Sequence, residues 1–211
     1  MSQVLGCIGQ IFGFNGSKEP QFQLLKQQPY QIRKIQSYII AKVQIKNKNE
    51  NQAFRILANY IGAFGKPFNT KSKSLAMTAP VLKEPIKIQM TTPVLNQNEF
   101  LSFVLPFEYS QIDQVPEPND KEIVFEKVDE QVVAVCQFSG ITNDKIFKSK
   151  LEELYKQIKN DRFINEEENI EQLNYQFARY NPPFCIPFMR RNEVWIILNE
   201  QKVNSIIIQK E

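Results

Sequence analysis

The sequence contains no histidine among its 211 residues. Without an imidazole, the protein can form neither a Ser-His-Asp nor a Cys-His nucleophile, and it has no histidine ligand for a metal. The three cysteines form no Cys-x-x-Cys pair, so we expect reduced thiols and no structural zinc site. A glycine-rich phosphate loop is also missing. These absences predict a protein that is not an enzyme.

Long apolar runs and an excess of charge of one sign are missing too. No run approaches the roughly 18–20 apolar residues that cross a bilayer, so we expect no transmembrane segment. The net charge of +3 provides no basic face of the kind that binds nucleic acid. The N-terminus lacks the early positive charge of a signal peptide, and we therefore expect a cytoplasmic protein.

The sequence does have the composition of a globular protein, with 42% hydrophobic and 23% charged residues. Its length allows a sizeable core. We expect a flexible N-terminal segment over residues 1–19, which begins with apolar residues and glycines. Residues 20–211 are then expected to form a single domain.

A short string occurs twice near the centre of the chain. Its copies are Ala76–Val81 (AMTAPV) and Gln89–Val94 (QMTTPV). Each copy is interpreted as a strand that stops at its proline, because proline cannot donate a hydrogen bond to a neighbouring strand. Between the copies, Lys83-Glu84-Pro85 is predicted to form a turn.

Two larger parts of the chain also resemble each other. Tyr30–Ile45 aligns without gaps to Ile123–Phe138, at an offset of 93 residues. In the second half of each segment, apolar residues recur at every second position, with Ile39, Ala41, Val43 and Ile45 falling on Val132, Ala134, Cys136 and Phe138. This spacing is typical of strands with one buried face. The same offset places Phe54 on Phe147, and both residues begin helical patterns.

Both predicted helices carry signals at their ends. The first is expected to start near Asn49 or Asn51 and to stop by Gly62. The second is preceded by Thr142-Asn143-Asp144, whose side chains are typical N-caps.

This repetition predicts the fold class. We expect an α+β protein in which pseudo-twofold duplicated strand–helix–strand–strand units form a distorted open antiparallel β-barrel flanked by two helices. The halves are expected at about residues 20–110 and 121–211, joined by a proline-containing link.

The two helices differ on one face, and this difference points to function. Off the core stripe, the second helix is polar where the first is apolar. The aligned pairs are Ile56 and Ser149, Leu57 and Lys150, and Tyr60 and Glu153. One explanation is that another part of the chain, such as residues 66–75 or the N-terminal segment, covers the apolar face. The other explanation is a groove for a flat apolar ligand or a partner protein.

Further residues extend the proposed groove. Phe64 continues the apolar side beyond the end of the helix, and Arg55 and Arg179 are candidate cations at the rim. Met77 and Met90 lie among apolar neighbours, where core packing is the default interpretation, and they are also candidate ligand contacts. The candidate binding residues are Arg55, Ile56, Leu57, Tyr60, Phe64, Met77, Met90 and Arg179.

Several motifs together resemble the SOUL haem-binding protein family, and most of all its plant-type members. They are Tyr30–Lys34, the helix end Leu57–Gly62, both Met-Thr-x-Pro-Val strings, Phe103–Pro106, and the run Ala178–Trp195 with its aromatic-Pro-Pro turn and Arg-Arg-Asn-Glu. The resemblance extends over most of the chain, from about residue 20 to residue 200.

The resemblance implies an α+β barrel that binds haem or another tetrapyrrole in a shallow apolar groove beside the first helix, with basic residues near the propionates. Some members use an axial histidine, which this chain lacks, so binding is expected without histidine ligation. Arg190 and Arg191 are expected to meet propionates or, as we favour, to form a structural salt bridge with Glu193 or with a neighbouring strand. The alternative is a module of the same fold that binds a protein or another apolar ligand and has lost haem binding.

Overall fold

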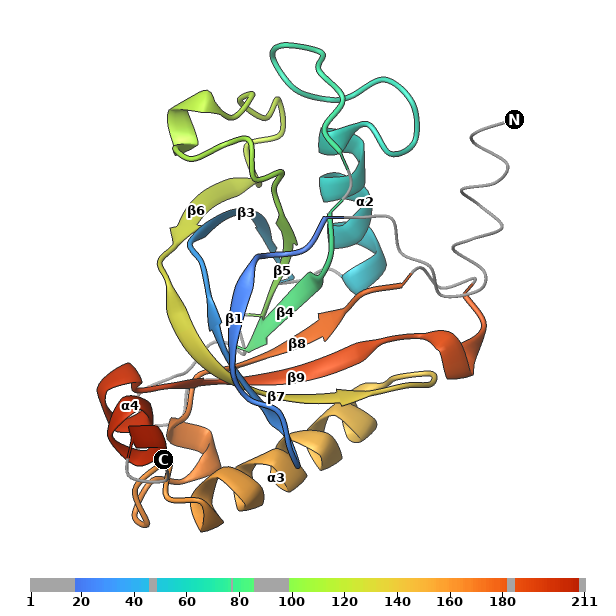
Figure 1. The fold of residues 1–211 in the computed structure, drawn as a ribbon. Helices are drawn as coiled ribbons and strands as arrows, with labels where there is room; N and C mark the ends of the chain where they lie inside the picture. Colours follow the sequence, from blue (N-terminus) through green and yellow to red (C-terminus); the bar gives the residue numbers. More distant parts are fainter. Residues whose placement is uncertain (1–17, 46–48, 77, 86–98, 182–184, 209–211) are drawn as a thin grey trace, which may run out of the picture. The chain divides into compact units, whose positions relative to one another are not determined.

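The computed structural model describes residues 18–45, 49–76, 78–85, 99–181 and 185–208 (Figure 1). The described residues form nine strands, three α-helices and three short 3-10 helices. In chain order these are β1 (Phe22–Lys26), β2 (Gln31–Ile35), β3 (Tyr38–Gln44), α2 (Glu50–Ile61), β4 (Val81–Pro85), β5 (Glu99–Val104), η1 (Ile112–Gln114), β6 (Val124–Val128), β7 (Gln131–Phe138), α3 (Asp144–Asn160), η2 (Ile170–Gln172), β8 (Tyr175–Arg179), η3 (Pro187–Met189), β9 (Asn192–Leu198) and α4 (Glu200–Ile208).

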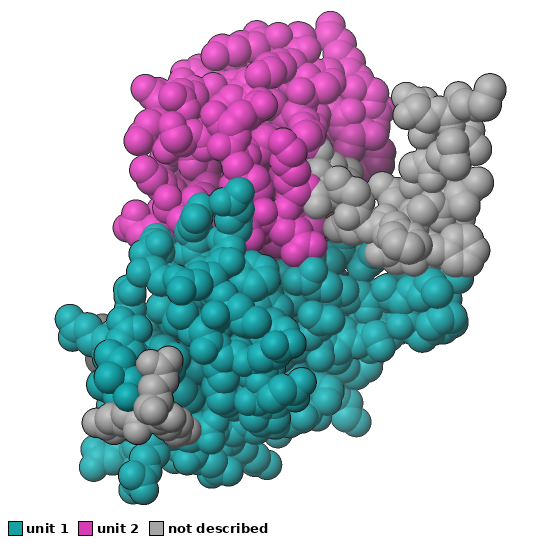
Figure 2. All heavy atoms as spheres, in the orientation of Figure 1, with its two compact units in different colours: residues 1–16, 21–36, 130–211 teal, residues 17–20, 37–129 magenta. Residues whose placement is uncertain are grey.

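The chain folds into two compact units (Figure 2). Unit 1 contains residues 21–36 and 130–211, and unit 2 contains residues 17–20 and 37–129. The chain therefore leaves unit 1 after β2 and returns to it at β7. The α+β class and the antiparallel pairing predicted from the sequence are confirmed within the units.

Unit 1 contains a sheet in the order β1-β2-β7-β9-β8, and α3 packs on one of its faces. The helix buries four apolar side chains at helical spacing: Phe147, Leu151, Leu154 and Ile158. They pack against inward-facing residues of β7 and β9, including Val132, Ala134, Val194 and Ile196. The short helix α4 closes the same core with Val203, which is fully buried.

Unit 2 contains a sheet in the order β4-β5-β3-β6, with α2 packed against β3 and β5. Ile39, Ala41 and Val43 occupy alternate positions of β3 and face the helix core, because successive side chains of a strand point to opposite faces. From α2, Ala53, Leu57 and Ala58 are buried in this cluster.

The predicted ends of both long helices are confirmed. Asn49 caps α2 through its side chain, which accepts from Gln52 N, and Gln52 completes a capping box. Gly62 ends the helix with φ of +82°, a left-handed conformation that favours glycine. Asn143 caps α3 by accepting from Ile146 N.

Two sequence-based assignments differ from the structure. Lys83-Glu84-Pro85 was predicted as a turn, but these residues belong to β4, which begins at Val81 and pairs with β5. The strand therefore starts after Pro80 instead of ending at it. Proline has no N–H to donate to a neighbouring strand, so it is better tolerated just before a strand than in the strand's interior. The second copy of the string, Gln89–Val94, lies outside the described residues.

A third helix, α4, was not expected from the sequence. Its segment ends in Ile206, Ile207 and Ile208, β-branched residues that favour strands over helices. Ile206 and Ile207 pack against the core of unit 1, so tertiary contacts decide the local conformation. None of the helices in the described part of the chain combines the length and the hydropathy of a membrane span.

Each unit contains the predicted strand–helix–strand–strand order. In unit 2 it is β3-α2-β4-β5, and in unit 1 it is β7-α3-β8-β9. The sheet orders also correspond, since β4-β5-β3-β6 matches β8-β9-β7-β2 position by position. Duplication of one ancestral half remains a prediction that this correspondence motivates.

Candidate functional site

The second apolar side of α2 is covered by the chain itself. Tyr60 is 0% exposed, and its hydroxyl donates to the carbonyl oxygen of Pro116 at 2.7 Å. The Tyr60 ring packs against Phe125 with ring centroids 5.7 Å apart. Leu57 is fully buried in the same cluster, which also contains Val115. Tyr60 and Leu57 are therefore core residues, in agreement with the first of the two explanations, that another part of the chain covers this face.

The covering segment is mainly residues 109–125, which follow β5 and lead into β6. Residues 66–75, the loop suggested by the sequence, also run along the helix, because Asn69 Nδ2 donates to Tyr60 O at 3.0 Å. The pKa of Tyr60 is raised, mainly because its hydroxyl is buried and to a smaller extent because of the neighbouring Tyr109. Tyr60 therefore stays a hydrogen-bond donor and is not available as a phenolate ligand.

Apolar surface remains at the C-terminal end of α2. Phe64 is 66% exposed and Phe68 is 52% exposed, while Ile56 is half-buried. The backbone N–H of Phe68 donates to Asn59 O at 2.9 Å, which fixes this segment beside the last turn of the helix. We call Phe64 and Phe68, which both follow the helix, the α2-end patch. Ile56 lies in the middle of α2 and packs against the core of unit 2. Phe64 was expected from the sequence, whereas Phe68 lies beyond the reach of helical periodicity.

Two cations belong to the same region. Arg55 and Lys66 are exposed, and neither forms an ion pair within the part of the chain that the structure describes. Arg179 instead belongs to unit 1, where its guanidinium lies over the Phe147 ring at 5.2 Å. Met77 and Met90 lie outside the described residues. The structure thus assigns Arg55, Ile56 and Phe64, among the predicted residues, to accessible surface of unit 2.

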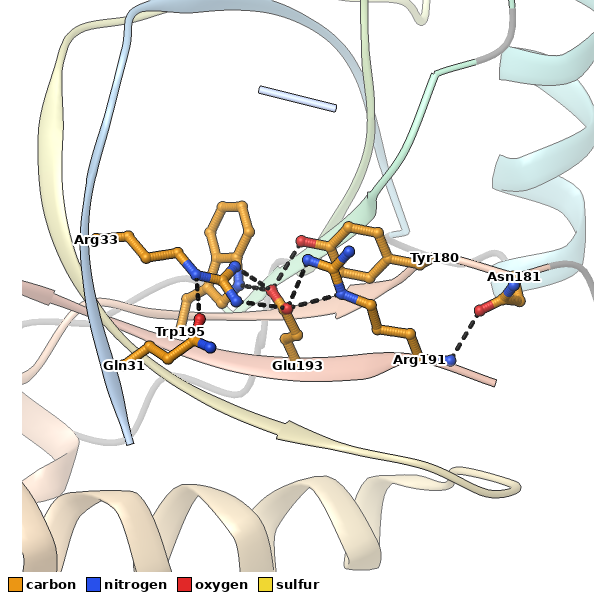
Figure 3. A network of polar contacts seen from close by, with 7 residues as sticks. All are labelled: Gln31, Arg33, Tyr180, Asn181, Arg191, Glu193 and Trp195. Carbon is orange, nitrogen blue, oxygen red and sulfur yellow. Dashed lines mark hydrogen bonds and ion pairs between the residues drawn. The ribbon is translucent and has the colours of Figure 1, made fainter. Parts of the chain in front are cut away.

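The most elaborate polar arrangement is in unit 1, around Glu193 (Figure 3). This side chain is 0% exposed. Arg33 of β2 binds both its carboxylate oxygens, with two hydrogen bonds of 3.0 Å. Arg191 donates to Oε1 at 2.9 Å, from the other side in Figure 3. Tyr180 Oη and Trp195 Nε1 each donate to Oε2 at 2.7 Å.

These contacts account for the specific Arg-Arg-Asn-Glu run of the sequence. The favoured salt bridge between Arg191 and Glu193 is confirmed. Arg190 donates from Nε to Cys185 O at 2.9 Å and so holds the loop before β9. Arg33, Tyr180 and Trp195 were not identified from the sequence as partners of Glu193, because Arg33 lies 160 residues away from it. We call Arg33, Tyr180, Arg191, Glu193 and Trp195 the Glu193 network.

Electrostatics within the Glu193 network favour the ionised carboxylate. Burial alone would raise the pKa of Glu193, but the charges of Arg33 and Arg191 and the hydrogen bonds outweigh it, so the pKa is lowered. Burial and the adjacent carboxylate raise the pKa of Tyr180 well above its ordinary value. Donors from four side chains thus meet one carboxylate, while Arg33 Nε donates to Gln31 Oε1 at 2.7 Å, and this saturation is typical of a structural clamp rather than of a reactive group.

Both cysteines in the described part of the chain belong to unit 1, whereas α2 belongs to unit 2. Cys136 belongs to unit 1, and burial raises the pKa of its thiol, which disfavours the thiolate. Cys185, also in unit 1, is buried. In the described part of the chain, no three Cys, Asp or Glu side chains cluster as a metal site requires. The exposed side chains of the α2-end patch are phenylalanines, which offer contact to an apolar ring and carry no metal-ligating atom.

Solved structures of other proteins share the fold at low sequence identity. The C-terminal domain of EcmrR matches with a TM-score of 0.52 and 12% identity, covering 81% of this chain and 98% of that one. An uncharacterized conserved protein from Listeria innocua gives 0.52 and 9%, covering 88% and 95%. A hydrolase from Listeria innocua gives 0.50 and 8%, covering 81% and 91%. Such identities show likeness of fold alone.

Comparison of sequences identifies a family for this chain but no individual curated relative. No curated protein sequence matches this chain. The family model described as SOUL heme-binding protein matches residues 17–197, which include α2, the covering segment 109–125 and the whole Glu193 network. Because that match spans both units, the chain belongs to the SOUL heme-binding protein family.

Proposed function

We propose that the protein binds haem or another tetrapyrrole at the α2-end patch, without enzymatic activity and without histidine ligation. The observation that carries this proposal is the match of the SOUL heme-binding family model to residues 17–197. A protein of this kind carries or buffers a tetrapyrrole, because it supplies contact surface rather than reactive groups.

The α2-end patch supports the proposal through its chemistry. Exposed aromatic rings at Phe64 and Phe68 give a flat porphyrin apolar contact, and aromatic pairs gain from offset stacking beyond the area they bury. Arg55 and Lys66 are exposed cations of the same unit, suited to the carboxylates of a tetrapyrrole. When haem is bound, it supplies the iron and the visible chromophore, while these side chains hold the ring.

Magnitudes allow binding without a bond to the metal. Burying about 400 Å² of porphyrin gives roughly 10 kcal/mol at about 25 cal/mol per Å². Association costs at least about 4 kcal/mol in lost freedom of motion. At most about 6 kcal/mol remains, which corresponds to a dissociation constant of roughly tens of micromolar or weaker. Iron then adds little, so haem and metal-free protoporphyrin IX should bind alike.

Titration of the protein with hemin and with protoporphyrin IX tests this proposal. We expect a saturable shift of the Soret band with both, and weakening by about tenfold or more in Phe64→Asp, which places a charge in the apolar contact. Phe188→Asp is the matched control, because Phe188 is 70% exposed and lies in unit 1. A flat titration, or equal loss in both variants, contradicts the proposal.

A second candidate function has one observation in its favour. Because Tyr60 and Leu57 are buried by residues 109–125, the groove expected from the sequence is closed. This favours a module of the same fold that has lost haem binding and uses the α2-end patch for a protein or another apolar ligand. It predicts no saturable porphyrin binding, together with a partner complex that Phe64→Asp disrupts and Phe188→Asp leaves intact.

A further inference from the structure

Unit 1 contains a pocket of about 450 Å³ that involves neither the α2-end patch nor the Glu193 network. It lies between the segment that follows α3 and the beginning of α4. The volume falls within the range of pockets that hold small organic ligands.

The floor of the pocket is apolar and buried. Phe163, Ile164, Leu173 and Leu198 line it, and each is at most 7% exposed. These residues belong to the core cluster of unit 1. An apolar ligand body placed on this floor would be shielded from water on its inner side, while its outer side would face the open mouth of the pocket. The apolar surface removed from water would contribute to the affinity for such a ligand.

Hydrogen bonds hold the walls in place. The N–H of Phe163 donates to Ile158 O at 2.9 Å, which ties the segment to the end of α3. The N–H of Asn165 donates to Glu168 Oε2 at 2.6 Å, and that of Ile197 donates to Asn174 O at 2.9 Å. The pocket is thus formed before any ligand arrives, so binding costs little ordering of the chain.

The rim carries one cation whose partner is a neutral atom. Lys202 Nζ donates to Asn165 Oδ1 at 2.5 Å, and within the described residues no carboxylate pairs with it. A ligand carboxylate would replace this amide contact by a charge-assisted hydrogen bond, which is roughly twice as strong. Glu168 also lines the pocket, where its Oε2 accepts from Asn165 N, so the rim carries one cation and one anion. It therefore offers a favourable contact to one carboxylate beside Lys202 and disfavours further negative charge. The charge pattern therefore selects a single carboxylate.

We propose that this pocket binds a small monocarboxylate with an apolar body. Lys202 at the rim would hold the carboxylate, and the floor formed by Phe163, Ile164, Leu173 and Leu198 would contact the apolar body. Tetrapyrroles with two propionates are poor candidates for it, because the rim offers one lysine and one glutamate. The proposal therefore stands apart from the function proposed for unit 2.

Titration with decanoate tests the proposal, with decanol as the neutral probe of the same chain length. We expect saturable calorimetric binding of decanoate and at least about tenfold weaker binding of decanol, because only the acid forms the charge-assisted contact. Amide resonances of residues 163–168 and 199–205 should shift in 15N spectra. A parallel titration with 1-naphthoate distinguishes an aromatic from a straight-chain body, and saturable binding of either acid at these resonances supports the proposal.

Substitutions at the rim separate charge from shape. In Lys202→Met, decanoate affinity should fall to that of decanol, while Lys202→Arg should keep it; Lys148→Met on the exposed side of α3 is the control. Ser205→Trp should block both probes, because this exposed residue lines the pocket. Equal binding of acid and alcohol, undiminished decanoate binding by Lys202→Met, unsaturable binding, or shifts elsewhere in the spectrum would each overturn the proposal.

Discussion

Single residues of the Glu193 network act far from their place in the sequence. Arg33 stands in β2, Tyr180 after β8, and Glu193 in β9, yet their polar atoms meet around one carboxylate. The sequence allowed the prediction of the Arg191–Glu193 pair, because these residues are neighbours on one segment. Arg33 has no local signal of its role: only the folded sheet, in which β7 separates β2 from β9, brings it to Glu193.

Replacing Glu193 by Gln should destabilise the protein strongly. The amide cannot accept from all the donors, and it leaves Arg33 buried without its counter-charge, which costs about 3–5 kcal/mol. Urea unfolding followed by Trp195 fluorescence measures the loss. Glu166→Gln in the exposed loop after α3 is the control, with a change below about 0.5 kcal/mol. A loss of similar size in both variants would contradict the clamp.

Acid should weaken the same contacts. Because the pKa of Glu193 is lowered in the folded protein, its contribution is complete above the ordinary pKa of a glutamate and is lost as the pH falls through the folded value. The free energy of unfolding should therefore decrease below about pH 4.5 more steeply in the wild type than in Glu193→Gln. Denaturant unfolding at a series of pH values compares the two slopes, and parallel slopes would exclude Glu193 as the titrating group.

At the scale of elements, helix ends were the most predictable features, since capping depends on one or two neighbouring residues. Asn49, Gly62 and Asn143 have the predicted roles. The sequence left two explanations open for the apolar side of α2, for the opposite reason. An apolar face looks the same in sequence whether a ligand or a distant segment covers it, and residues 109–125 cover this one.

Gly62→Ala should destabilise α2 more than Gly65→Ala does. Both glycines have positive φ, +82° and +127°, so an added Cβ is strained at either position. At Gly62, however, the new atom would also meet Pro67 Cβ at 3.0 Å and Gly65 O at 3.2 Å, whereas Gly65 has open space. Thermal unfolding should show about 1 kcal/mol or more of additional loss for Gly62→Ala. Equal losses of stability in the two variants would mean that the loop around Pro67 can move away from the added Cβ at no cost in free energy.

The whole molecule interleaves its two predicted halves. β2 comes from the first half of the sequence but pairs with β7, and β6 comes from the second half but pairs with β3. The repeat at an offset of 93 residues revealed the matching segments, but not that unit 1 takes β1 and β2 from the first half and unit 2 takes β6 from the second. Local patterns cannot specify such pairing, because either partner presents the same alternation.

Fragments cut in the link between the halves should therefore fail to fold separately. Residues 1–115 contain β2 without β7, and residues 116–211 contain β6 without β3. Each fragment should show weak, non-cooperative thermal transitions by circular dichroism, and mixing them should restore a cooperative one. Cooperative folding of either fragment alone would show that the exchanged strand contributes little to its unit.

The exchange of strands has a consequence for protein synthesis. As the nascent chain leaves the ribosome, β2 emerges early, but its partner β7 follows only after all of residues 37–129. Unit 2 can assemble while translation continues, whereas unit 1 must wait for β9, which carries Glu193. Until then β2 presents an unpaired edge, which is open to association with other chains. Chaperone demand should therefore be greatest late in translation.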